Sequence, residues 1–126
     1  MKTDFLKKRA QEFTRDAELA IKERRWNSAA FHLEQVCQLL LKHYLFLKWK
    51  DFPKTHSLRE LLIELKRAYT KNKRKIEKFI KENEHTIGDL EQAYITSRYL
   101  PVEFNEKQVK EMEKFKNKLL ALLKKL

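Results

Sequence analysis

The sequence predicts an all-α protein, an antiparallel up-and-down helical bundle of four to five helices, and three observations support this prediction. The 126 residues include one glycine and two prolines, whereas a β-rich fold needs turn residues about every ten positions. Apolar residues recur at helical spacing along most of the chain. The length suits one domain, and a hydrophobic fraction of 42% can fill its core. We therefore expect residues 1–126 to form a single helical-bundle domain.

The first part of the chain predicts two helices. Apolar residues return at helical spacing from about residue 3 to residue 24. Asn27 is the predicted N-cap of a second helix over residues 28–48, and Trp26 precedes it as a hydrophobic staple. The second half of this helix is apolar almost all round, which places it at the bundle centre or in a subunit interface. We expect three of its residues to lie in the interface of a homodimer: Leu45, Phe46 and Leu47.

Pro53 breaks the helical pattern and marks the main loop. After it, Ser57 and Glu60 have the spacing of a capping box at the start of a third helix with one leucine-rich stripe. The basic segment that follows, residues 71–85, has few apolar residues to anchor it. It is either a continuation of the third helix or a short separate one.

The remaining chain predicts two more helices. Thr86 and Asp89 again have capping-box spacing, and Pro101 ends the helix that they would open. Asn105 with Gln108 caps the last helix. The leucines near the C-terminus continue the apolar period of that last helix. We therefore expect them in the bundle core rather than on a membrane surface.

A formal net charge of +11 favours nucleic acid, nucleotides, acidic proteins or anionic lipid as partners. Residues 66–81 hold eight cationic side chains against one acid, Glu77. This run could follow a phosphate backbone. A solvated helix face is the slightly favoured interpretation, because arginines and exposed aromatic residues, which stack on bases, are scarce in it.

Several classes of function are disfavoured. No apolar stretch is long enough to span a bilayer, no signal peptide is recognisable, and the single Cys37 cannot form an internal disulfide, so we expect a cytoplasmic protein without a membrane role. The four histidines lack metal-ligand spacing, and Cys37 lies in an apolar run that makes it a small hydrophobic residue. With Gly88 as the only glycine, glycine-rich phosphate loops are excluded. We expect no metal, no cofactor and no catalytic residue.

A short stretch, "YITSRYLPVEF" at residues 94–104, brings an arginine and two tyrosines to a helix end. Further candidates lie late in the second helix, Lys42 and His43, and at the start of the third, His56 and Arg59. Physical chemistry alone favours structural roles for most of them. In that interpretation His56 caps a helix, and Arg98 stacks on Tyr94 at the i, i+4 spacing.

Four segments together resemble the HEPN domain family. They are an aromatic–Ala–Ala–Phe helix start at residues 26–31, a core-helix pattern at 35–42, a Thr–His–x–Leu step at 55–58 and a late Arg–Tyr–Pro-type end at 97–101. The resemblance implies a helical bundle that dimerises and that is commonly paired with a minimal nucleotidyltransferase in a toxin–antitoxin type module. Many relatives are metal-independent ribonucleases with a histidine four to six residues after an arginine.

The sequence departs from that pattern in two places. No histidine follows Arg98, and Gln38 stands where the family's core helix has a glutamate. The resemblance then implies a non-catalytic domain that binds nucleotide or RNA, as a homodimer with a nucleotidyltransferase partner. The expected contact set is Lys42, His56, Tyr94 and Arg98. Two alternatives stay open: an endoribonuclease that combines Arg98 with another histidine such as His56, and a protein-interaction module without a ligand.

Overall fold

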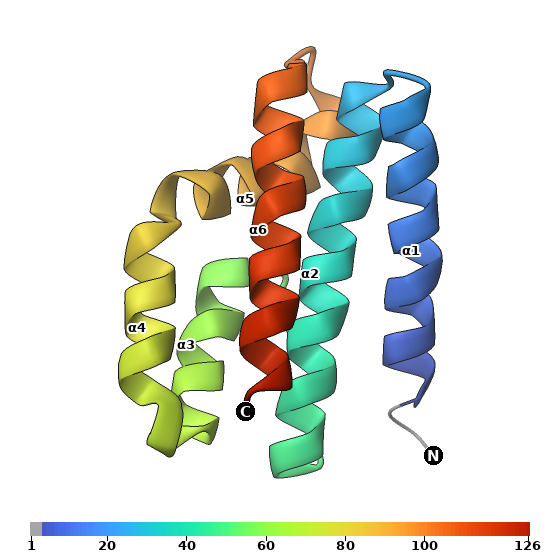
Figure 1. The fold of residues 1–126 in the computed structure, drawn as a ribbon. Coiled ribbons are helices and arrows are strands. Elements are labelled where there is room, and N and C mark those ends of the chain that lie inside the picture. The colour runs from blue at the N-terminus through green and yellow to red at the C-terminus, as the bar shows by residue number, and fades with distance from the viewer. Residues whose placement is uncertain (1–3) are drawn as a thin grey trace.

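The computed structural model describes residues 4–126, apart from the side chains of residue 4 and residues 96–98. The side chain of Arg98, one of the predicted contact residues, therefore lies outside the described residues. The described chain contains no strand, which confirms the all-α prediction, and its helices form the bundle in Figure 1. The described residues form six α-helices, more than the four to five predicted, and one 3₁₀ turn: α1 (Asp4–Lys22), α2 (Trp26–Trp49), α3 (Leu58–Ala68), η1 (Thr70–Asn72), α4 (Lys73–Glu82), α5 (Glu84–Tyr99) and α6 (Glu106–Lys124).

Helix α2 is the centre of the bundle, as its apolar pattern predicts. It packs against α1, α3, α5 and α6 (Figure 1). Leu45 is fully buried, so the prediction that it forms part of a dimer surface is wrong. Phe46 packs against Phe52 with ring centroids 6.4 Å apart, and only Leu47 of the three residues is substantially exposed, at 46%. Most of the apolar second half of α2 therefore serves the core, whereas Leu47 and Trp49 at its end are exposed.

Two helix starts form as their sequences predict. The Asn105 side chain accepts a hydrogen bond from the Gln108 backbone N–H (2.8 Å), and the Gln108 side chain accepts one from the Asn105 N–H (2.9 Å). At α3, the Ser57 hydroxyl accepts from the Glu60 N–H (3.2 Å). The Glu60 carboxylate accepts from the Thr55 hydroxyl (2.6 Å), so only one half of the Ser57 capping box is present.

Two other predicted starts are wrong. Helix α2 begins at Trp26, before Asn27, and the Asn27 side chain instead binds the loop between α5 and α6. Its amide donates to the Val102 carbonyl (3.1 Å), and its carbonyl accepts from the Phe104 N–H (2.7 Å). Helix α5 begins at Glu84, which leaves Thr86 inside the helix rather than at its cap.

The basic segment forms a separate helix, α4, after the 3₁₀ turn η1. Ile76 and Phe79 are buried on its inner face, and the Phe79 ring lies 5.2 Å from that of Phe115 on α6. Most of its lysines and arginines remain exposed. A few apolar anchors are thus enough to hold this helix against α3 and α5.

The C-terminal helix α6 buries its leucine stripe. Leu119 and Leu123 are fully buried, which confirms that these residues belong to the core. Within residues 4–126, none of the helices combines the length and the apolar character that crossing a bilayer needs.

Candidate functional site

Three of the four predicted contact residues line one hollow of about 210 Å³. Lys42 comes from α2, His56 from the loop before α3, and Tyr94 from α5. The other residues that line it all belong to α2: Phe31, Gln35, Gln38 and Leu39. Arg98 follows Tyr94 by one turn of α5, and its side chain is outside the described residues.

The other candidates have separate contacts. His43 is largely buried and packs edge-on against Tyr44, with ring centroids 5.4 Å apart. The Arg59 guanidinium lies 3.5 Å from the Glu84 carboxylate. Neither residue lines the hollow.

His56 and Tyr94 form an aromatic stack beside the hollow. Their ring centroids are 4.9 Å apart, and the ring planes differ by 18°. Ser57 holds this arrangement in place, because its hydroxyl donates to the Glu91 carboxylate on α5 (2.6 Å). The same Glu91 oxygen accepts the Arg59 N–H (3.2 Å). The start of α3 and the middle of α5 are thereby joined next to the two rings, and the helix cap belongs to Ser57 rather than His56.

A buried carboxylate, Glu34, lies behind the hollow and was not predicted as a site residue. Its side chain is 0% exposed. The amide nitrogens of Gln35 (2.8 Å) and Gln38 (2.5 Å) donate to its two oxygens. Burial raises the pKa of Glu34 to about 7, although the two glutamines and the positive charge of Lys42 act in the opposite direction.

Helix α2 therefore still holds a buried acidic residue, Glu34, although Gln38 stands at the position of the glutamate in the family pattern. The carboxylate lies one helical turn before Gln38, which donates a hydrogen bond to it. A single acid within the apolar run "FHLEQVCQLLL" was the available signal, since a charge at a core-facing position needs buried partners.

Lys42 supplies a cation at the hollow. Burial lowers the pKa of its ammonium, and the Glu34 carboxylate opposes that shift. Its nitrogen lies 5.8 Å from the Phe52 ring centroid. A partly desolvated lysine beside stacked rings can bind an anionic group while a planar ring packs beside it.

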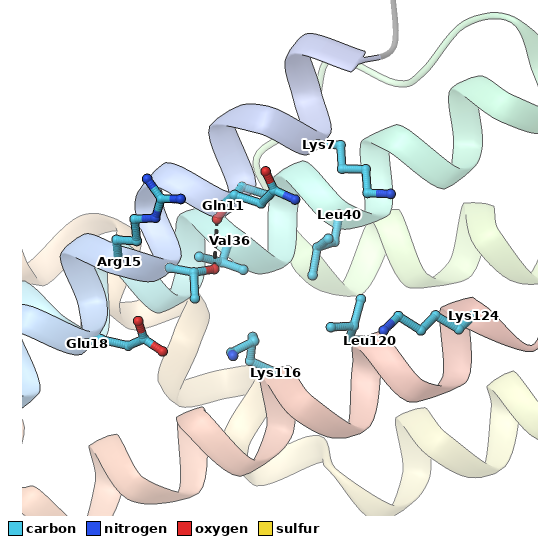
Figure 2. A pocket seen from close by; sticks show the side chains of 11 residues that line it. Lys7, Gln11, Arg15, Glu18, Val36, Leu40, Lys116, Leu120 and Lys124 are labelled. Atoms are coloured by element: carbon cyan, nitrogen blue, oxygen red, sulfur yellow. Dashed lines mark hydrogen bonds between the residues drawn. The ribbon is translucent and has the colours of Figure 1, made fainter.

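A larger open groove, of about 630 Å³, lies between α1 and α6 above a floor from α2 (Figure 2). Its walls carry Lys7, Arg15, Lys116 and Lys124, and its floor includes Val36 and Leu40. It contains none of the predicted contact residues, and no residue lining it is aromatic. The smaller hollow, where a cation, two amides and aromatic rings converge, is therefore the better candidate for recognition of a planar ligand.

Other reactive groups are buried or scattered. Burial and the nearby Glu34 charge raise the pKa of the Cys37 thiol well above its usual value, and the side chain is fully buried. This agrees with the prediction that Cys37 behaves as a small hydrophobic residue. Among the described residues, histidine, cysteine and acidic side chains form no group of three or more that could hold a metal ion.

Comparison with known proteins gives one match. No curated protein and no solved structure matches this chain. The family model for the HEPN domain matches residues 3–126, nearly the whole chain. The order of helices, the segments named above and this match agree, and the chain belongs to the HEPN domain family.

Proposed function

We propose that this chain is a non-catalytic HEPN domain that binds a nucleotide or RNA in the hollow lined by α2, the loop before α3, and α5. The observation that supports this most strongly is the convergence of Lys42, His56 and Tyr94 from three separate elements. A lysine ammonium attracts phosphate, and aromatic side chains provide stacking surfaces for bases. The formal charge of +11 favours approach of an anionic ligand.

In this proposal Lys42 and Arg98 contact phosphate, and Tyr94 with His56 stacks on the base. Arg98 is included because its backbone lies one turn after Tyr94 on the same helix. The domain binds rather than cleaves, since no histidine follows Arg98 in the sequence to transfer protons beside it.

The test is thermal unfolding at low salt in the presence of AMP, CMP, GMP or UMP and of short single-stranded RNA. A ligand that binds only the folded state raises the melting temperature by several degrees at saturating concentration. Lys42→Met and Tyr94→Ala should abolish most of the shift, whereas Lys110→Met, an exposed lysine on α6, should leave it intact. If none of these ligands moves the melting temperature of the wild-type protein, the proposal is wrong.

Ribonuclease activity is the rival outcome. The His56 ring stacks on Tyr94, and Tyr94 precedes Arg98 by one turn of α5. RNA cleavage that survives EDTA and disappears in both Arg98→Ala and His56→Ala would replace the binding proposal with a metal-independent endoribonuclease.

We also propose that the domain is a homodimer that pairs through the end of α5. Large apolar side chains are exposed on the last turns of α5 and in the loop that follows it, and exposed apolar surface is typical of interaction sites. They are Ile95 (57% exposed), Tyr99 (72%), Leu100 (52%) and Val102 (47%). Light scattering after size exclusion should give a dimer for the wild type and a monomer for Ile95→Glu/Leu100→Glu. A wild-type monomer at micromolar concentration would contradict the dimer.

A protein partner is the last part of the proposal. Membership of the HEPN family supports a minimal nucleotidyltransferase as that partner, in a module of the toxin–antitoxin type. Co-purification of the tagged chain from its own cells, followed by mass spectrometry, tests this. Recovery of the chain without any nucleotidyltransferase would count against it. A stable protein complex with no effect of nucleotide or RNA would instead favour an interaction module without a ligand.

A further inference from the structure

Glu34 fixes the orientation of two glutamine amides. Above its pKa of about 7 the Glu34 carboxylate is ionised and has only acceptor atoms, so a glutamine beside it must then present its NH₂ group. Gln35 and Gln38 both do so, each to a different oxygen of Glu34. With both nitrogens held by Glu34, the carbonyl oxygens of the two amides point away from the carboxylate.

These carbonyl oxygens remain available at the hollow. Gln35 and Gln38 both line it, and neither carbonyl oxygen accepts a hydrogen bond from any described residue. Gln38 is only 4% exposed, yet no described side chain keeps a buried polar atom without a partner. The carbonyl oxygen of Gln38 is therefore not fully buried, and Gln38 is one of the residues that line the hollow.

The carbonyl oxygens of Gln35 and Gln38, on successive turns of α2, favour a ligand that offers hydrogen-bond donors. An exocyclic amino group carries two N–H donors and can pair with both oxygens. A base with a keto oxygen in that position brings an acceptor instead and can satisfy at most one glutamine through a ring N–H. The second glutamine would then face an oxygen, and both groups would lose their hydrogen bonds to water without replacement.

We propose that the hollow selects nucleotides whose base carries an exocyclic amino group, such as adenine and cytosine, over the keto analogues hypoxanthine and uracil. This selectivity rests on the proposed function of the hollow as a nucleotide site. Gln35 and Gln38 read the base, and Glu34 acts as a positioning residue that holds both amides in the reading orientation.

Isothermal titration calorimetry at pH 8 and low salt tests the selectivity with two matched pairs, AMP against IMP and CMP against UMP. Each pair differs at the amino position of the base and shares its phosphate and sugar. We expect AMP and CMP to bind about ten-fold or more tightly than IMP and UMP, the range for a well-made hydrogen-bonded base contact. Equal dissociation constants within both pairs would overturn the inference and leave nucleotide binding standing.

Variants assign the selectivity to the glutamines. Gln38→Met keeps the length of the side chain but removes the acceptor, so the AMP/IMP ratio should fall towards one while IMP binding is retained. Gln35→Met provides the same test if Gln38→Met does not fold, as judged by far-UV circular dichroism. Gln11→Met, an exposed glutamine on α1, is the control and should keep the wild-type ratio.

The possible failures are distinct. A wild-type protein that binds none of the four nucleotides overturns this inference, and it overturns the proposed function as well when GMP and single-stranded RNA also leave the melting temperature unchanged. An unchanged AMP/IMP ratio in both glutamine variants overturns the assignment to Gln35 and Gln38. Preference for IMP or UMP would show that the amides present their nitrogens to the ligand, which contradicts the orientation argued from Glu34.

Discussion

Replacing Glu34 by glutamine should remove one pH-dependent contribution to the stability of this protein. The pKa of Glu34 is about 7 in the folded state because the carboxyl group is buried, against 4.5 for an exposed glutamate. Between these two values the folded state holds a proton that the unfolded state has released. The free energy of unfolding contributed by this group therefore falls as pH rises from about 4.5 to 7, and is constant above that range.

The size of the effect follows from the same shift. One pKa unit corresponds to about 1.4 kcal/mol, so full ionisation of Glu34 in the folded protein costs about 3 kcal/mol. Glu34→Gln removes this cost but also disturbs the hydrogen bonds of Gln35 and Gln38, which is a penalty that does not depend on pH in this range. The stability of the variant relative to the wild type should therefore rise by about 2 to 3 kcal/mol between pH 5 and pH 8.

Urea denaturation at several pH values between 5 and 8, followed by circular dichroism, measures this difference directly. Glu12→Gln, at an exposed position on α1, serves as the control and should run parallel to the wild type. Parallel curves for Glu34→Gln and the wild type would show that burial does not raise the pKa of Glu34 as the structure indicates.

Three further predictions concern the fold. Leu45→Ala should destabilise the protein by about 2 to 5 kcal/mol in urea, because Leu45 is fully buried, and Leu47→Ala by much less; equal effects would contradict the core assignment. Asn27→Ala should cost about 1 to 3 kcal/mol, since its two bonds to the loop between α5 and α6 are lost, and no change in the melting temperature would refute their contribution. Cys37 should resist thiol reagents until the protein unfolds, and rapid labelling of the native state would contradict its burial.

The parts of the fold that depend on neighbouring residues could be predicted from the sequence. The capping box of Asn105 and Gln108 forms between residues three apart, so its spacing was sufficient. Asn27 carries the same kind of local signal, but its side chain bonds with residues 102 and 104, and this long-range contact removes it from the helix cap. Residue spacing along the chain does not show that residues 102 and 104 compete with the helix start for the Asn27 side chain.

The hollow likewise combines features that follow from neighbouring residues with features that depend on long-range packing. Lys42 lies late in α2 and His56 just before α3, and a short loop joins these two helices, so local connectivity brings both residues to the hollow. The stacking of Tyr94 on His56 depends on how α5 packs across α3, which periodicity does not determine. Glu34 was missed because its burial arises from the packing of α2 against several helices, whereas its sequence neighbours gave no metal or catalytic pattern.

Helix α5 contributes to both the proposed nucleotide site and the proposed dimer interface. Tyr94 faces the hollow, and the next residue, Ile95, is exposed among the apolar side chains at the end of the same helix. A nucleotide and a second protomer would therefore act on adjacent residues of one rigid element. If dimerisation raises the affinity of the hollow for nucleotide by some factor, bound nucleotide must raise the affinity of the two protomers for each other by the same factor. With such a coupling, the cellular nucleotide concentration would shift the balance between monomer and dimer.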